Sequence, residues 1–201
     1  MANIMLLRHG QIRANRQGRW HGSTDSPLTW RGRRQARRTA RHLAGAAPRV
    51  EAIYSSPLSR CRDTAGAIAQ ALSLEVEVHD GLREYALGDW ENERFHDLAG
   101  RYQFIQTATR DHDFTPPGGG ESLRQVAARI VPAIQQIHER HPGDERVLIV
   151  SHGAALAVAL GALIDGDPGC WTRYHFANCS LTELVLSPAP YVNFFNQTQH
   201  L

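Results

Sequence analysis

Two stretches decide the fold, Leu6-Leu7-Arg8-His9-Gly10 and Ile149-Val150-Ser151-His152-Gly153. In each, an apolar run passes into a polar residue, a histidine and a glycine, and continuous apolar runs are typical of strands in parallel sheets covered on both faces. Ligands bind beyond the carboxyl ends of such strands, and glycine after the histidine lets the backbone turn and a ligand approach closely. If the two strands are neighbours, His9 and His152 face one small volume, with Arg8 beside them.

The rest of the chain alternates strand and helix patterns. We expect further strands at 50–54 and 74–78, helices at 29–45, 57–72, 122–141 and from about 154, and a tail of two extended pieces around a turn at 187–190. The helix at 57–72 should carry Pro57 in its first turn. This alternation predicts an α/β fold, a three-layer α/β/α sandwich with a mostly parallel central sheet. We expect a single domain over residues 1–201, with the irregular stretch 81–120 as a lid or insertion.

The composition narrows the class of protein. All 22 basic residues are arginines, which excludes a Schiff-base lysine, a pyridoxal-phosphate anchor and a P-loop lysine. Three cysteines without a CxxC pair suggest a reducing compartment. The start has no signal-peptide pattern, and the longest apolar stretch is shorter than the roughly 20 residues that span a bilayer. We therefore expect a cytoplasmic protein without a membrane partner.

Arginines are concentrated at the beginning of the chain. The first 62 residues hold 13 arginines and two acidic residues, a net +11, whereas the rest carries a net −9. The densest block comprises Arg31, Arg33, Arg34, Arg37, Arg38 and Arg41. It indicates either a solvated helix face or a nucleic-acid-binding stripe. We favour the solvated face and no nucleic-acid partner, because no aromatic residue interleaves the block and no nucleic-acid module is legible.

A third segment, Ser55 to Ala65, follows the strand at 50–54. It places Arg60 in the first turn of a helix, whose N-terminus already favours an anion. Because guanidinium groups grip phosphate bidentately, Arg8, Arg60 and the two histidines would form a compact pocket for a tetrahedral dianion.

Five motifs occur in the order seen in one known family: Arg8-His9-Gly10, the Ser56-Pro57-Leu58 stretch with Arg60, Leu82-Arg83-Glu84, Gly119-Gly120-Glu121-Ser122, and Ser151-His152-Gly153. From residue 4 to about 180 the chain resembles the histidine phosphatase superfamily, the phosphoglycerate-mutase-like group. The resemblance implies the same fold and a phosphoryl-transfer activity. The stretch around Leu87-Gly88-Asp89-Trp90-Glu91 resembles the alpha-ribazole phosphatase branch.

The resemblance also implies roles for individual residues. The catalytic set comprises His9 as nucleophile, Arg8 and Arg60 as phosphate-gripping arginines, His152 as second histidine, and Glu84 as proton donor. The substrate-binding set comprises Asn15, the loop pair His21 and Gly22, and Gly153, although the family commonly has glutamine in place of His21.

The chemistry of these side chains supports the same assignment. A neutral imidazole at His9 can attack phosphorus and carry the phosphoryl group. Arg8, Arg60 and a protonated His152 would supply the positive charge that a metal ion otherwise gives, so we expect no metal and no cofactor. Glu84 would protonate the leaving alkoxide and then activate the water.

We therefore predict a metal-independent phosphatase of small-molecule phosphate monoesters. A phosphoglycerate mutase or a phosphoprotein phosphatase could use the same residues, although known mutases usually carry longer insertions. An arginine-rich nucleic-acid-binding protein with a vestigial pocket remains the alternative from another class. A homodimer is compatible with the sequence, which does not determine the oligomeric state.

Overall fold

The computed structural model describes residues 3–201, and its centre is a six-stranded sheet in the order β3-β2-β4-β1-β5-β6. The strands β3, β2, β4 and β1 run parallel, β5 is antiparallel to β1, and β6 is antiparallel to β5. The bounds are β1 Asn3–Arg8, β2 Val50–Ser55, β3 Val76–Val78, β4 Arg146–Ser151, β5 Leu181–Val185 and β6 Tyr191–Gln197. The mostly parallel sheet confirms the expected class.

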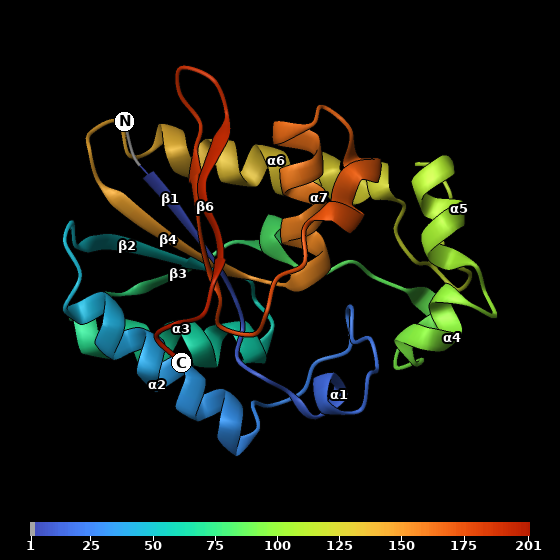
Figure 1. The fold of residues 1–201 in the computed structure, drawn as a ribbon, viewed down its shortest axis with the longest axis horizontal. Helices are drawn as coiled ribbons and strands as arrows, with labels where there is room; N and C mark the ends of the chain where they lie inside the picture. Colours follow the sequence, from blue (N-terminus) through green and yellow to red (C-terminus); the bar gives the residue numbers. More distant parts are fainter. Residues whose placement is uncertain (1–2) are drawn as a thin grey trace.

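Helices cover both faces of the sheet (Figure 1). Successive strand residues point to opposite faces, so Ile4 and Leu6 of β1 pack in one core cluster and Met5 and Leu7 in another. The first cluster contains residues of α6 (Leu123–Glu139) and α7 (Gly153–Ile164). The second contains residues of α2 (Trp30–Ala44) and α3 (Ser59–Leu72). The three-layer sandwich is therefore confirmed.

Side-chain caps define the starts of two predicted helices. Thr29 caps α2 by accepting from the amide of Gly32, and Ser122 forms a capping box with Gln125 at the start of α6. The prediction that Pro57 lies in a first helical turn is wrong. Leu58 is the N-cap of α3 and has an extended backbone. The backbone N–H of Ser59, the first residue of the helix, donates to the carboxylate of Asp25 at 2.7 Å.

The expected strand at 74–78 is shorter than predicted, because only 76–78 pairs with β2. The tail is confirmed as two paired strands, β5 and β6. No helix within residues 3–201 is long and apolar enough to cross a membrane.

The helices of segment 81–120, α4 (Phe95–Ala99) and α5 (Phe104–Arg110), lie at one end of the molecule (Figure 1). Segment 81–120 also contains a short helical turn, η2 (Gly88–Trp90), and its start overlaps the turn η1 (Asp80–Leu82). Its side chains Tyr85 and Phe104 are fully buried, with ring centroids 5.6 Å apart. Both rings contact Trp20, from the loop after α1 (Arg13–Arg16), and Trp171, from η3 (Pro168–Arg173). Aromatic side chains of this segment are thus part of the main core.

Candidate active site

Parallel pairing of β1 and β4 brings the two strand-end histidines together. Arg8 lies opposite Ser151 in the register, so the next residues, His9 and His152, leave the sheet side by side. Their ring centroids are 5.3 Å apart. The two strands are neighbours, which is the condition under which the sequence predicts that the two histidines face one small volume.

The His9 ring is held as a neutral imidazole with one free nitrogen. Its Nδ1 lies 2.8 Å from the carbonyl oxygen of Gly10, which can only accept, so Nδ1 carries the proton. Burial, followed by the charges of Arg60 and Arg8, holds the pKa of His9 well below its usual value. The lone pair on Nε2 is therefore available at neutral pH.

The His152 ring is also neutral, which corrects the expectation of a protonated second histidine. The Nε–H of Arg60 donates to His152 Nδ1 at 3.2 Å, so the proton of the ring is on Nε2, which donates to Ser56 Oγ at 2.7 Å. Burial and then the charge of Arg60 hold the pKa of His152 well below its usual range. With Arg60 Nε directed at Nδ1, a second proton on the ring would meet a donor instead of an acceptor.

Arg60 is fully buried and uses its other donors on a loop. Its Nη1 donates to the carbonyl of Thr24, and its Nη2 donates to the carbonyls of His21 and Gly22. The guanidinium therefore lies behind the two histidines, where it fixes the loop and polarises His152.

Arg8 has a different position, on the wall of the cavity that contains His9. One of its Nη groups donates to the carbonyl of Phe176, whereas its buried Nε has no hydrogen-bond partner within residues 3–201. A Cβ on Gly153 would come within 3.2 Å of this guanidinium, so glycine leaves room for it. An unpartnered buried donor is costly, and an anion in the cavity would satisfy it.

Glu84 faces the same cavity from segment 81–120. Its carboxylate accepts hydrogen bonds from the amides of Ala154 (3.3 Å) and Ala155 (2.8 Å) in the first turn of α7, and from the amide of Tyr85. Its two oxygens are thereby fixed against the first turn of α7, in the cavity that His9 also lines.

From the sequence alone we assign no role to the residues that hold these elements in place. Arg129 pairs with Glu121 at 2.7 Å and also donates to the carbonyls of Gly81, Arg83 and Glu84. The motif residue Glu121 additionally accepts from the amide of Ala86. This ion pair fixes the backbone on both sides of the Glu84 side chain.

A second carboxylate, Glu91, fixes the loop that carries His21. It accepts from the amides of Gly22, Ser23 and Thr24, and also from that of Leu87. Both roles depend on contacts between distant segments, so no local pattern could have revealed them.

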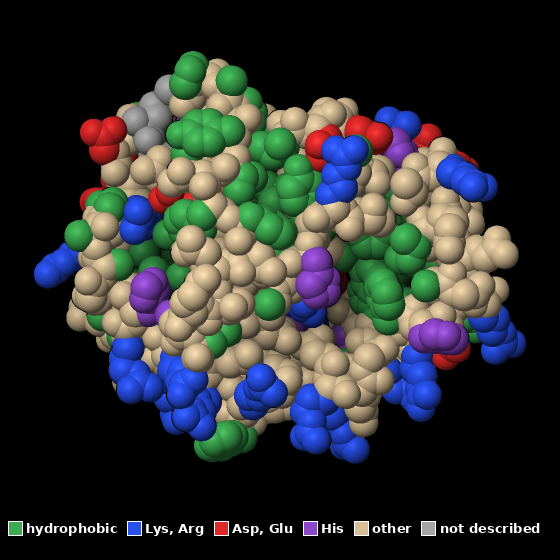
Figure 2. Space-filling view, viewed as in Figure 1, with side chains coloured by type: hydrophobic (Ala, Val, Ile, Leu, Met, Phe, Trp, Pro, Cys, Tyr) green, Lys and Arg blue, Asp and Glu red, His purple; other side chains and the backbone are tan. Residues whose placement is uncertain are grey.

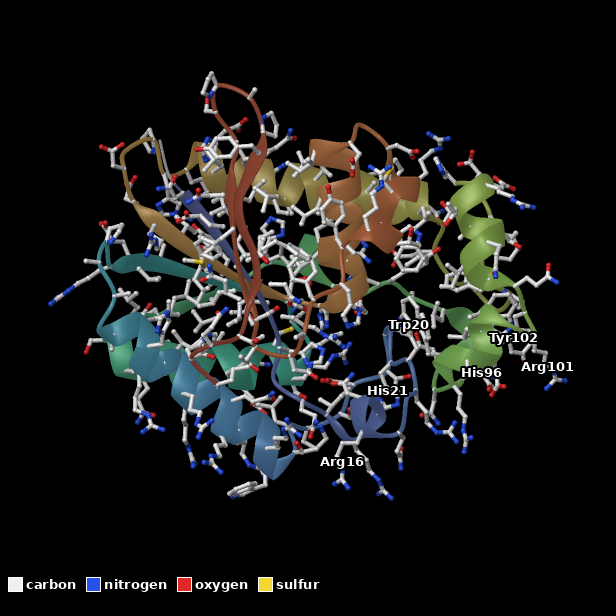
Figure 3. All side chains as sticks on the ribbon, viewed as in Figure 1. Arg16, Trp20, His21, His96, Arg101 and Tyr102 are labelled. Carbon is white, nitrogen blue, oxygen red and sulfur yellow. The ribbon has the colours of Figure 1, made fainter. Side chains whose placement is uncertain are left out.

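The cavity itself has a volume of about 350 Å³. Six of the predicted site residues line it: Arg8, His9, Asn15, His21, Glu84 and Gly153. The predicted residues Arg60, His152 and Gly22 are fully or almost fully buried behind that wall. Aromatic side chains such as Trp20 and Trp171 form the other side. Figure 3 shows Trp20 and His21 together on the loop that faces α4.

Four further hydrogen bonds involve two of the predicted binding residues, Asn15 and His21. The side-chain oxygen of Asn15 accepts from the backbone N–H of Ile12 and from the side-chain NH₂ group of Asn178, and Asn15 lines the cavity. His21 bonds Asn92 and Ser26. Within residues 3–201, no group of three or more histidine, cysteine or acidic side chains is arranged to hold a metal ion.

Comparison with known proteins agrees with this geometry. Residues 4–193 match the histidine phosphatase superfamily (branch 1). The chain is 35% identical, over 98% of its length, to a bifunctional protein of Mycobacterium tuberculosis, of which it spans only 54%. It is 37% identical over 160 residues (78% of this chain, 66% of the other) to the metal-independent phosphoserine phosphatase of Arabidopsis thaliana. It is 31% identical, over 96% of this chain and 88% of the other, to a probable phosphoglycerate mutase of Photorhabdus laumondii.

Solved structures share the whole fold. A phosphoserine phosphatase from Entamoeba histolytica, in complex with 3-phosphoglyceric acid, has a TM-score of 0.87 at 28% identity over all of both chains. A mycobacterial glucosyl-3-phosphoglycerate phosphatase has a TM-score of 0.85 at 31% identity over 98% of this chain and 99% of the other. An Escherichia coli structure described as a putative alpha-ribazole-5'-P phosphatase shares the fold, with a TM-score of 0.82 at 24% identity, over 98% of this chain and 96% of the other. The chain belongs to the histidine phosphatase superfamily.

Proposed function

We propose that this protein is a metal-independent phosphatase that hydrolyses a small phosphate monoester through a phosphohistidine on His9. One observation carries the proposal: the cavity is lined by a neutral His9 with a free Nε2, by Arg8, whose buried Nε–H has no partner within residues 3–201, and by Glu84. A nucleophile, an anion-binding donor and a proton carrier are what phosphoryl transfer requires.

The reaction proceeds in two balanced steps. His9 Nε2 attacks phosphorus, the bond from phosphorus to the ester oxygen breaks, and the leaving alkoxide takes a proton from Glu84. Water then attacks phospho-His9, Glu84 takes the proton of that water, and the N–P bond breaks to release phosphate and the free imidazole. Arg8 neutralises charge on the phosphoryl oxygens in both steps, and Arg60 keeps His152 in its neutral tautomer.

The organic part of the substrate would lie against the aromatic side of the cavity, formed by Trp20, Phe95, Trp171 and Tyr174. Phe95, Ile105 and Glu84 reach this cavity from segment 81–120, which supports its role as a lid over the bound ester. Phosphoserine, 3-phosphoglycerate and alpha-ribazole phosphate are the first candidates, because relatives and structural neighbours are named for these compounds or bind them.

The test is hydrolysis of p-nitrophenyl phosphate in excess chelator, followed by trapping of the phosphoenzyme. His9→Ala should abolish both turnover and the trapped phosphoenzyme, whereas His96→Ala, which removes a ring that is 96% exposed, should change neither. Activity lost to the chelator, or equal rates for wild type and His9→Ala, would contradict the phosphohistidine mechanism.

Glu84→Gln separates the two proton transfers. p-Nitrophenolate leaves without a proton, so the variant should form phosphoenzyme from p-nitrophenyl phosphate and then hydrolyse it slowly. With an alkyl phosphate such as phosphoserine, formation itself should slow, by the 10²–10⁴-fold typical of general acid catalysis. If phosphoenzyme formation were slowed equally with both substrates, Glu84 would not be the acid.

The same site could transfer the phosphoryl group to a second alcohol instead of water, as the mutase-named relative suggests. Incubation with 3-phosphoglycerate distinguishes the two: a phosphatase releases inorganic phosphate, whereas a mutase forms the 2-phospho isomer.

A further inference from the structure

A second cavity, of about 650 Å³, adjoins the catalytic one. The two cavities share Arg8 and His175. The α2 wall of the second cavity carries Arg31, Arg34 and Arg38, which lie three and four residues apart on one side of the helix. Figure 2 shows arginine side chains gathered along the lower edge of the molecule, where Figure 1 places α2.

These three guanidinium groups are not neutralised. Within residues 3–201, none of them forms an ion pair or a hydrogen bond, whereas Arg33 of the same helix donates to the carbonyl of Leu28. Three like charges along one concave wall raise the positive potential inside it. If α2 only exposed its arginines to solvent, we would expect them on a convex surface. The solvated-face interpretation therefore does not explain why Arg31, Arg34 and Arg38 line a cavity.

An aromatic side chain accompanies this arginine row. Trp30, the first residue of α2, is 68% exposed, and the Arg34 guanidinium lies 5.6 Å from the centroid of its ring. The block from Arg31 to Arg41 contains no aromatic residue, but Trp30 precedes it by one position, and helical spacing places the Trp30 ring beside Arg34. A cation–π contact reduces the freedom of Arg34 and so lowers the entropic cost of binding an anion.

We propose that this cavity, which we call the α2 groove, binds a polyanion with two or more phosphate groups beside the catalytic pocket. From Arg31 to Arg38 the row extends over about 10 Å of helix axis, at 1.5 Å per residue, which is more than a single phosphate can contact. Arginine is the side chain best suited to such binding, because it donates bidentately and keeps its charge. The polyanion is either a free molecule or the distal part of a multiply phosphorylated substrate.

The test is calorimetric titration of tripolyphosphate into the full chain. Arg34→Gln with Arg38→Gln removes two charges from the α2 groove. Arg37→Gln with Arg41→Gln removes two charges from the same helix, at exposed positions outside the groove. We expect the first pair to weaken binding at least tenfold and the second to weaken it less than twofold. Failure of the wild type to bind, or equal weakening by both pairs, would overturn the proposal.

Repeating the titration with saturating orthovanadate, a phosphate analogue for the catalytic pocket, distinguishes the two sources of the polyanion. Binding that persists with vanadate and still depends on the first pair indicates a free ligand. Binding that vanadate abolishes but that also depends on the first pair indicates a ligand reaching across both cavities. Binding that vanadate abolishes and that is indifferent to the first pair overturns the proposal. The titration needs no turnover, so it remains decisive even if the proposed hydrolysis is wrong.

Discussion

Replacing Arg129 by lysine should disturb Glu84 without touching the cavity. The guanidinium of Arg129 serves five acceptors: both oxygens of Glu121 and three backbone carbonyls of the segment that carries Glu84. A lysine ammonium has three donors, so at least two of these bonds are lost. Hydrogen bonds to charged groups contribute about 1.5 kcal/mol or more each, so the free energy of unfolding should fall by about 3 kcal/mol.

The activity should fall as well. The lost bonds include the one to the Glu84 carbonyl, and a displacement of about 1 Å in a catalytic group costs roughly 10²-fold in rate. We expect kcat to drop by one to two orders of magnitude while KM for p-nitrophenyl phosphate changes little, because Arg129 does not line the cavity.

Arg124→Lys provides a matched control on the same helix. Arg124 pairs with Asp113 at 2.7 Å, but the two side chains are 64% and 67% exposed, against 15% and 23% for Arg129 and Glu121. Exposed pairs contribute at most about 1 kcal/mol. Urea unfolding and steady-state kinetics check both variants. Equal losses of stability would refute the buried network, and a large loss of stability with unchanged kcat in the folded enzyme would refute the positioning role.

Three further predictions follow from burial and close packing. Burial, followed by the charge of Arg60, holds the pKa of His9 and of His152 well below its usual value in the folded state. As the pH falls below about 6.5, the unfolded chain therefore binds protons that the folded chain does not, and the free energy of unfolding should fall by up to about 1.4 kcal/mol per pH unit for each histidine. Urea titrations should show a smaller fall for His152→Gln than for the wild type. Burial raises the pKa of the Cys61 thiol, so iodoacetamide at mildly alkaline pH should label the partly exposed Cys170 of the native protein and spare Cys61; mass spectrometry showing labelled native Cys61 would contradict this. Gly153→Ala puts a methyl group 3.2 Å from the Arg8 guanidinium, so inhibition by orthophosphate should weaken several-fold with little change in thermal stability, and an unchanged inhibition constant would show that Arg8 does not bind the phosphate.

The sheet and the paired histidines could be predicted because each depends on local pattern. Buried strands need continuous apolar runs, and matched strand ends bring His9 and His152 together once β1 and β4 are neighbours. The charge of His152 could not be predicted, since it depends on which nitrogen meets Arg60 across the fold.

Segment 81–120 was also difficult to predict. Its helices are short and have no clear period, and its aromatic rings are buried by partners from elsewhere in the chain, such as Trp20 and Trp171. The sequence shows the motif around Glu121, but it does not show the ion pair between Glu121 and Arg129, because that pair depends on a tertiary contact.

The position of β1 has a consequence for how the protein is made. β1 begins at Asn3, yet both its sheet neighbours, β4 and β5, begin beyond residue 145. During synthesis the apolar run of β1 therefore emerges well before β4 and β5, and neither neighbouring strand is present to pair with it until they have been translated. Such long-range pairing is slow and leaves an aggregation-prone segment exposed. Because the site needs β1 between β4 and β5, enzymatic activity should be among the last properties to recover during refolding. The time course of its recovery would then report when β1 pairs with β4 and β5.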